Sequence, residues 1–167
     1  MRLLRPIPFL LAATLALCGL PAKAASPAPV SAANGMVVSA QHHATEVGVA
    51  VLREGGNAVD AAVAVGYALA VVYPAAGNLG GGGFMTLQLA DGSAHFIDFR
   101  ETAPAAVHAR SFLDAEGKPI AGASTLGHRA VAVPGTVAGL ELARMRFGSL
   151  SRRRLVAPAI RLAQRGF

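Results

Sequence analysis

Apolar residues recur at helical spacing in the segment ATEVGVAVLREGG, in the first half of the chain. Val47, Val51 and Leu52 define one face of the expected helix. Gly55 then stands where a helix commonly ends, because glycine readily adopts the left-handed conformation of that position. The pattern therefore predicts an amphipathic helix that stops at Gly55.

The next segment, AVDAAVAVGYALAVV (residues 58–72), predicts a second helix of a different kind. Asn57 can cap it, and Asp60 stands three residues later at the spacing of a capping box. The segment is apolar on nearly every side, so other elements must cover most of it. Such a helix belongs in the middle of a layered protein rather than on a surface.

Alternating apolar and polar residues predict a β-hairpin after this helix. GGFMTLQLA and SAHFIDF have the composition and alternation of strands, and the segment ADGS between them carries an Asp-Gly turn signal. Further upstream, GMVVSAQ (residues 35–41) is a short apolar run that predicts a buried strand.

The second half begins with a long irregular stretch, RETAPAAVHARSFLDAEGKPIAGAS, which is rich in turn residues. A short strand is expected in AVAVPG, ending at Pro134. A helix capped by Thr136 and stopped at Gly148 follows. Ser151 then caps a last helix that Pro158 kinks or restarts.

Together these elements predict an α+β fold that is incomplete in this chain. Several apolar helices accompany only two clearly paired strands, which is too little sheet to bury them. A helix that stops at Gly166, with only apolar Phe167 after it, adds to the expectation of a chain truncated at its C-terminus.

The first 24 residues have the pattern of a secretory signal peptide. Arg2 and Arg5 precede an apolar core, FLLAATLALCGL, which is too short to span a bilayer comfortably, and the small residues AKA follow. We expect cleavage after Ala24, with a flexible tether in residues 25–33, and we expect the mature chain in the periplasm or outside the cell. The alternative is an uncleaved membrane anchor.

Composition and charge then exclude several classes of protein. Hydrophobic residues make up 53% and charged residues 14% of the chain, which argues against disorder. The formal charge of +6 falls to +3 when the three basic residues of the signal leave. Without tryptophan or aromatics interleaved with a basic stripe, the mature chain does not resemble a nucleic-acid binder, and SRRRL (residues 151–155) is expected to be a solvated helix start.

The residue types offer little catalytic machinery. The only cysteine, Cys18, leaves with the signal, so neither a thiol nucleophile nor a disulfide is available. His42 and His43 are adjacent and have no carboxylate at ligand spacing, which predicts no metal site. No nucleophile elbow or zinc-protease motif is present, and the sequence implies no organic cofactor.

The stretch NLGGGGFMTLQLADGSAHFIDFRETAP (residues 78–104) carries the strongest candidate site. Four glycines could cradle a phosphate, but they lack the Lys-Ser/Thr of a P-loop and precede a strand instead of a helix. Close passage of the backbone beside another segment or a ligand is the alternative. Arg100 is a candidate clamp for a carboxylate, because a guanidinium matches a carboxylate with two hydrogen bonds; a local pair with Asp98 or Glu101 is the other interpretation.

Several motifs of this stretch and its surroundings resemble the opening of the large subunit of γ-glutamyltranspeptidases. They are GGNAVDAA, GNLGGGGFM, DFRETAP, AVPGTVAGLELA, FGSL and APAIRLAQRGF, and the resemblance covers residues 34–167.

The resemblance implies an N-terminal nucleophile hydrolase with a four-layer αββα fold, made from a precursor that cuts itself into a large and a small subunit. It also implies that Arg100 binds the α-carboxylate of the γ-glutamyl donor, such as glutathione. The nucleophilic threonine belongs to the small subunit, and its processing motif is not in this sequence. The chain alone is therefore expected to be inactive and to contain no catalytic residue.

Two alternatives remain open at this point. One is a non-catalytic periplasmic module that binds glutamate-like carboxylates through Arg100. The other keeps the enzyme family but changes the donor, as in related acylases that act on β-lactam side chains; the intact DFRE motif favours an amino-acid-like donor.

Overall fold

The computed structural model describes residues 28–167, and the chain divides into two units, Met1–Ala33 and Asn34–Phe167. In the first unit, the described residues 28–33 are exposed and form neither helix nor strand. The predicted signal peptide, residues 1–24, lies outside the described residues.

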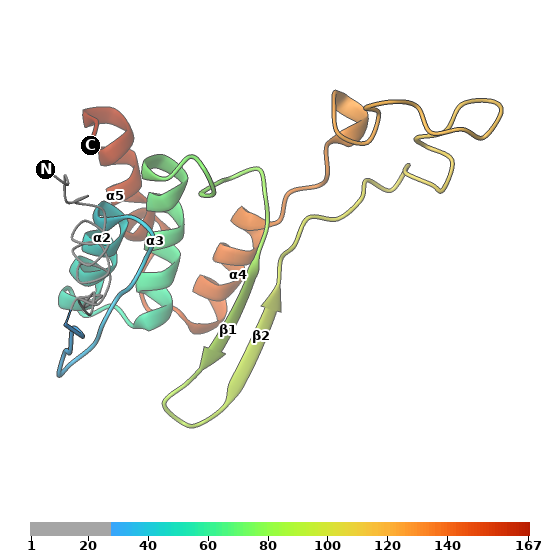
Figure 1. Ribbon diagram of the computed structural model, residues 1–167. Coiled ribbons are helices and arrows are strands. Elements are labelled where there is room, and N and C mark those ends of the chain that lie inside the picture. The colour runs from blue at the N-terminus through green and yellow to red at the C-terminus, as the bar shows by residue number, and fades with distance from the viewer. Residues whose placement is uncertain (1–27) are drawn as a thin grey trace, which may run out of the picture. The chain divides into compact units, whose positions relative to one another are not determined.

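The second unit combines four α-helices with one β-hairpin (Figure 1). Its elements, in chain order, are α2 (His42–Arg53), α3 (Ala58–Val72), β1 (Phe84–Gln88), β2 (Ala94–Asp98), the short 3₁₀ helix η1 (His128–Ala130), α4 (Thr136–Phe147) and α5 (Arg152–Arg165). The predicted α+β class is confirmed.

Helix α3 lies at the centre of the helical layer, as its apolar composition predicts. It packs against α2, α4 and α5. Val63, Ala64 and Ala68 are completely buried. The alanines bring the neighbouring helix backbones close together, and this explains why the sequence has no polar side along residues 58–72.

The ends of these helices follow local signals in the sequence. Gly55 has a φ of 86° just beyond α2, and the predicted stop is confirmed. The capping box at the start of α3 is also present, because Asn57 Oδ1 accepts from the Asp60 N–H and Asp60 Oδ2 accepts from the Asn57 N–H. Ser151 caps α5 as predicted, and α5 continues through Pro158 without a break.

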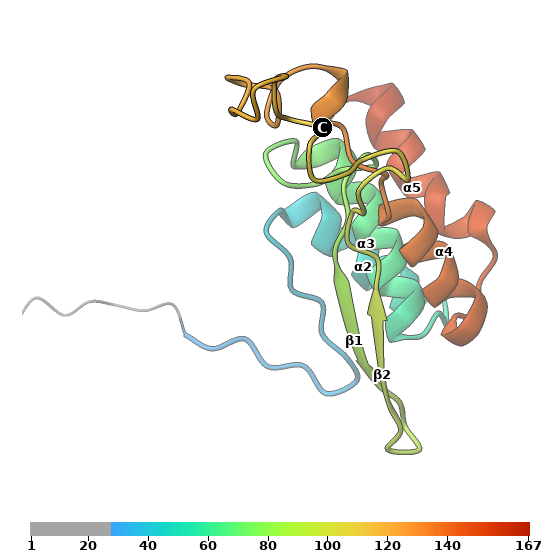
Figure 2. The same ribbon diagram turned by 90° about the vertical axis from the view of Figure 1, so that its right-hand side faces the viewer.

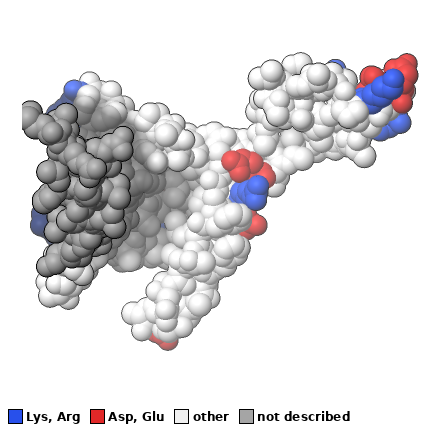
Figure 3. All heavy atoms as spheres, in the orientation of Figure 1, with Lys and Arg blue, Asp and Glu red and all other residues white. Residues whose placement is uncertain are grey.

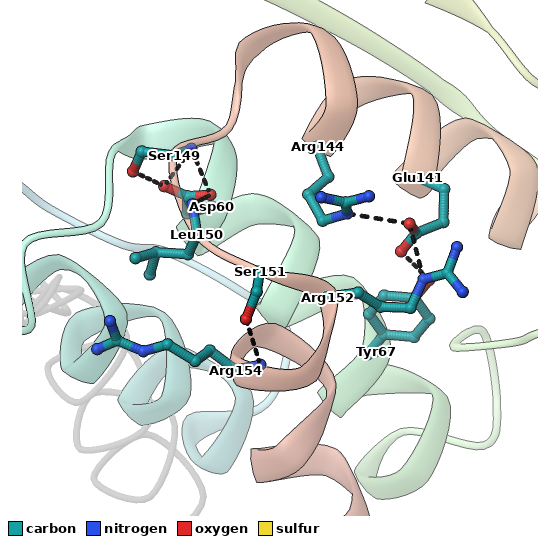
Figure 4. Close-up of polar contacts among 9 residues, drawn as sticks. All are labelled: Asp60, Tyr67, Glu141, Arg144, Ser149, Leu150, Ser151, Arg152 and Arg154. Carbon is teal, nitrogen blue, oxygen red and sulfur yellow. Dashed lines mark hydrogen bonds and ion pairs between the residues drawn. The ribbon is translucent and has the colours of Figure 1, made fainter.

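Asp60 does more than cap its own helix (Figure 4). Its carboxylate is fully buried and also accepts from the Ser149 hydroxyl at 2.6 Å and from the backbone N–H groups of Ser149 and Leu150 at 3.1 Å. Burial alone would raise the pKa of Asp60, but the hydrogen bonds from Ser149, Asn57 and Leu150 together outweigh it and lower the pKa. One carboxylate thus ties the start of α3 to the turn between α4 and α5.

A second polar cluster joins α3, α4 and α5 through the buried side chain of Glu141 (Figure 4). Glu141 accepts from the Tyr67 hydroxyl at 3.2 Å, from Arg144 at 3.0 Å and from Arg152 at 2.9 Å. Burial would raise the pKa of Glu141, but the two arginines lower it. Arg154 pairs with Glu54 at 3.0 Å, so two of the three consecutive arginines that begin α5 have carboxylate partners.

Strands β1 and β2 form the predicted antiparallel hairpin, with Phe84 opposite Asp98. The turn is one residue longer than a two-residue Asp-Gly turn: Leu89 N–H donates to the Ser93 carbonyl, and Gly92 has a φ of 84°. Figure 2 shows the hairpin along one face of the helical layer, where Met85, Leu87 and Ile97 join the core. On the opposite face Phe84 and Phe96 stack on each other and remain exposed.

Two strand predictions are wrong. Residues 35–41 form no strand and pair with none in the described chain, and Val38 is 84% exposed. The AVAVPG segment contributes a single bridge, Val133 to Thr102, in place of a strand. Strand formation requires a partner edge, and an apolar run alone does not supply one.

The predicted role of Thr136 as a helix cap is also wrong. The cap residue of α4 is Gly135, and no side chain caps this helix. Instead the Gly81 carbonyl accepts from the N–H groups of Gly135 and Thr136, at 2.8 and 3.0 Å. A distant backbone group thus does what a local side chain was expected to do.

We predict that Asp60→Asn destabilises the 167-residue chain by about 2–3 kcal/mol at neutral pH, since an amide cannot accept from all of the donors around it. The folded-state pKa is lowered, so the carboxylate contributes stability above its unfolded pKa of about 3.9 and loses it as pH falls through the folded value. The difference between variant and wild type should therefore shrink below about pH 4.

Urea unfolding at several pH values measures this difference. Glu116→Gln makes the same chemical change at an exposed position and is the control. Equal stability of Asp60→Asn and wild type at pH 7 would contradict the role assigned to Asp60.

Candidate functional site

Arg100 lies two residues beyond the end of β2, and the backbone is hydrogen-bonded both before and after it. Before it, Phe99 N–H donates to the Gly83 carbonyl at 3.0 Å and extends the ladder beyond β2. After it, Thr102 and Val133 exchange two backbone hydrogen bonds, of 3.2 and 2.8 Å. Arg100 therefore occupies a short segment between two paired positions.

The Phe99 side chain anchors this segment to the core. It packs against the buried cluster of the helical layer and lies directly on Gly139 of α4, where a Cβ atom would overlap its ring. A Cβ atom on Gly135, just before α4, would likewise overlap the Phe99 carbonyl oxygen. Only glycine permits this approach, so α4 and residue 99 are in direct contact.

The glycine run supplies the other side of this contact. A Cβ atom on Gly82 would lie 2.6 Å from the Phe99 carbonyl oxygen and 2.7 Å from the Glu101 nitrogen. On Gly83 it would lie 3.0 Å from the Phe99 ring, whereas a Cβ on Gly80 would meet nothing within 4 Å. The prediction of close backbone passage is confirmed at Gly82 and Gly83.

Asn78 fixes the start of the run. Its side-chain Oδ1 accepts from the Gly81 N–H and from the Thr136 hydroxyl, both at 2.7 Å. The Gly81 carbonyl also accepts from the N–H groups at the start of α4, so both Asn78 and Gly81 connect the glycine run to α4. The backbone N–H of Gly81 is engaged here rather than free to bind a phosphate.

Arg100 itself is exposed, and its guanidinium makes no ion pair among residues 28–167. Neither Asp98 nor Glu101 pairs with its side chain; Asp98 Oδ1 accepts from the Arg100 backbone N–H at 3.0 Å instead. Figure 3 shows a small group of charged side chains beside the end of β2, separate from the charged group at the far end of the loop between β2 and α4. A guanidinium whose donors are unpaired in the described residues can bind a carboxylate or another small anion.

Other candidate residues do not assemble around Arg100. On α2 the rings of His42 and His43 lie 3.9 Å apart, centroid to centroid, at an interplanar angle of 38°, and His43 Nδ1 lies 3.9 Å from Glu46 Oε2. Within the described part of the chain, no three His, Cys, Asp or Glu side chains are grouped so that they could hold a metal ion.

The sequence singled out Arg100 as a candidate but did not indicate the residues that hold its backbone. Gly135 and Gly139 lie in the AVPGTVAGLELA segment, and nothing local distinguishes them from ordinary loop and helix glycines. A glycine inside a helix costs about 1 kcal/mol relative to alanine, and that cost is the one signal that Gly139 has a packing role.

Comparison with known proteins identifies the family of the chain. A family model described as gamma-glutamyltranspeptidase matches residues 44–167. The glutathione hydrolase proenzyme of Pseudomonas sp. (strain A14) is 66% identical over 144 residues, which cover 86% of this chain and 25% of that protein. The corresponding proenzyme of Escherichia coli (strain K12) is 54% identical over 139 residues, covering 83% and 24%. This chain thus spans about a quarter of the length of these curated relatives.

A solved structure extends the comparison to the fold. The gamma-glutamyltranspeptidase of Helicobacter pylori superposes with a TM-score of 0.80 at 47% sequence identity, over 83% of this chain and 40% of that one. The helical layer and hairpin are thus part of an N-terminal nucleophile hydrolase fold. The chain belongs to the gamma-glutamyltranspeptidase family.

Substitution within the glycine run tests the packing around Phe99. Gly82→Ala should destabilise the chain by about 1–3 kcal/mol, because the new Cβ would overlap backbone atoms that cannot move independently. Gly80→Ala is the matched control; its Cβ would meet open space and its φ is not in the left-handed region, so it should change stability by less than about 0.5 kcal/mol.

Thermal unfolding of Gly82→Ala, Gly80→Ala and the wild type measures the change in stability that each substitution causes. Equal effects of Gly80→Ala and Gly82→Ala would mean that the run does not pack against residues 99–101 as described.

Proposed function

We propose that this chain is the N-terminal part of the large subunit of a secreted or periplasmic γ-glutamyltransferase, or glutathione hydrolase. The whole enzyme would cleave γ-glutamyl amides such as glutathione and transfer the γ-glutamyl group to water, amino acids or peptides. The observation that carries the proposal is Arg100, whose guanidinium is unpaired within residues 28–167 while its backbone is held on both sides.

The role of Arg100 in this proposal is to bind the α-carboxylate of the γ-glutamyl donor. A guanidinium offers two parallel N–H donors to a carboxylate, which fixes the orientation of the bound group as well as its position. Because Phe99 is packed against Gly135 and Gly139, the backbone from which the Arg100 side chain extends has a fixed position. Binding then costs less ordering of the protein.

The chemistry belongs to a second part of the same precursor. An N-terminal threonine of the small subunit attacks the γ-glutamyl carbonyl carbon, with its own amine accepting the hydroxyl proton, and the amine of the leaving peptide departs after protonation. Water or an acceptor amine then attacks the resulting γ-glutamyl ester and releases the threonine. This chain contributes recognition and no catalytic residue, and the mechanism needs no metal or organic cofactor.

The N-terminal segment fits the proposed location. A signal peptide in residues 1–24 would direct export, and residues 25–33 would form a tether before the folded part. Over the part of the chain that the structure describes, no helix has both the length and the hydropathy to cross a membrane. Partners in this scheme are the γ-glutamyl donor and the small subunit.

The alternative is a non-catalytic module that binds glutamate-like carboxylates through Arg100. The two proposals differ in what the full-length gene product does. An enzyme precursor should appear as two chains on a denaturing gel and turn over γ-glutamyl donors, whereas a binding module should stay whole and bind glutamate without turnover.

In the full-length gene product, Arg100→Lys should raise KM for γ-glutamyl donors about ten- to a hundredfold, since lysine keeps the charge but loses the paired donors. Self-cleavage should be nearly unaffected. Steady-state kinetics with a γ-glutamyl amide, alongside a denaturing gel, measure both.

Arg53→Lys is the matched control, because Arg53 is exposed at the end of α2 and has no ion pair in the described chain. Unchanged donor KM in Arg100→Lys, with normal cleavage, would refute the clamp while leaving the enzyme proposal intact. A full-length product that neither cleaves itself nor turns over donors would refute the enzyme proposal.

A further inference from the structure

Residues 103–132 form a long loop that leaves and returns at the Thr102–Val133 bridge. Local hydrogen bonds give the loop a defined shape. Ile120 N–H donates to the Phe112 carbonyl at 2.9 Å, and Leu113 and Pro119 form a bridge around a tight turn. The loop is therefore more than an irregular connection between β2 and α4.

This loop contains a pocket of about 380 Å³. Its polar lining comes from His108, Arg110, Ser111 and Arg129, and its apolar lining includes Val107, Phe112 and Leu113. Arg110 and Arg129 are 19 positions apart in the chain, and the fold of the loop brings both residues to the lining of this one pocket.

Most N–H donors of the Arg110 and Arg129 guanidinium groups have no acceptor in the described residues. Neither pairs with a carboxylate in the described residues. Arg110 Nη2 makes one long hydrogen bond of 3.5 Å to the Ala115 carbonyl, and the Arg129 side chain makes none in the described chain. His108 Nδ1 accepts from the Arg110 backbone N–H at 3.2 Å, which orients the ring within the same cluster.

Acidic residues occur close by but do not line the pocket. Asp114 and Glu116 belong to the adjoining turn, where Asp114 Oδ1 accepts from the Lys118 backbone N–H at 2.8 Å. Figure 3 shows acidic and basic side chains together at the far end of the loop. The lining itself carries two positive charges and no negative one.

We propose that this pocket is a second carboxylate-binding site, separate from Arg100. Its ligand is the carboxylate of an amino acid or of a peptide C-terminus that carries an apolar side chain. Arg110 and Arg129 bind the carboxylate, and Phe112, Leu113 and Val107 contact the apolar part. The inference rests on the loop alone and holds whether or not the whole protein is an enzyme.

Binding of N-acetyl-L-leucine to the ¹⁵N-labelled 167-residue chain tests the site, followed by NMR through the backbone amides of residues 106–113 and 129. The probe has one carboxylate, one apolar side chain and no free amine. N-acetyl-L-leucinamide, which lacks the charge, should bind at least about tenfold more weakly, since a charge-assisted contact is lost.

Arg129→Gln should weaken binding of the acid about tenfold, and because this side chain makes no hydrogen bond in the described chain, its loss should leave the loop folded. Lys118→Gln removes the same charge from the same loop outside the pocket lining and should change the affinity by less than about twofold. Arg100→Gln should also leave the response of residues 106–113 unchanged.

Each of four results would overturn the site. The amide could bind as well as the acid, Arg129→Gln could bind like the wild type, or Lys118→Gln could weaken binding as much as Arg129→Gln. The last result would mean general attraction of anions to a basic loop. Inorganic sulfate has no apolar group. If it bound as tightly as N-acetyl-L-leucine, the proposed apolar contacts would contribute nothing to binding.

Discussion

The candidate site depends on the packing of Phe99 against three glycines. Its ring lies on Gly139, its carbonyl lies against Gly135, and Gly82 passes within a distance that no side chain would allow. These contacts bring the start of α4, the glycine run and the end of the hairpin to one point. Arg100 is the next residue, so the position of its backbone is a consequence of packing in the core and not of interactions made by its own side chain.

Polar contacts within the helical layer hold α4 in the position from which it contacts Phe99. Asp60 ties the start of α3 to the turn after α4, and Glu141 joins α4 to Tyr67 on α3 and to Arg152 on α5 (Figure 4). Both carboxylates are buried and each accepts several hydrogen bonds, which fixes relative positions more strictly than apolar contact alone. Helix α4 is therefore held at both its buried face and its C-terminal end, and it presents Gly135 and Gly139 to Phe99.

Sequence reasoning succeeded where the deciding interaction lies within a few residues. Asn57 with Asp60, the Asp-Gly turn and the stop at Gly55 all depend on such neighbours, and each is observed. It failed at residues 35–41 and at Thr136, because a strand needs a partner edge and the N–H groups at the start of α4 donate to the Gly81 carbonyl, more than fifty residues away. Arg100 stands out in the sequence as a candidate, through its chemistry and its motif, whereas Gly135 and Gly139 do not, since close backbone approach leaves no mark in the sequence beyond glycine itself.

Amide hydrogen exchange in the 167-residue chain tests the central claim most directly. The N–H groups of Phe99 and Thr136, which donate to Gly83 and Gly81, should exchange as slowly as core amides of α3. The N–H of Gly117, in an exposed turn of the long loop, should exchange much faster even though it also has a backbone acceptor. Exchange of Phe99 and Thr136 at the rate of Gly117 would contradict the account, because the backbone beside Arg100 would then open independently of the core.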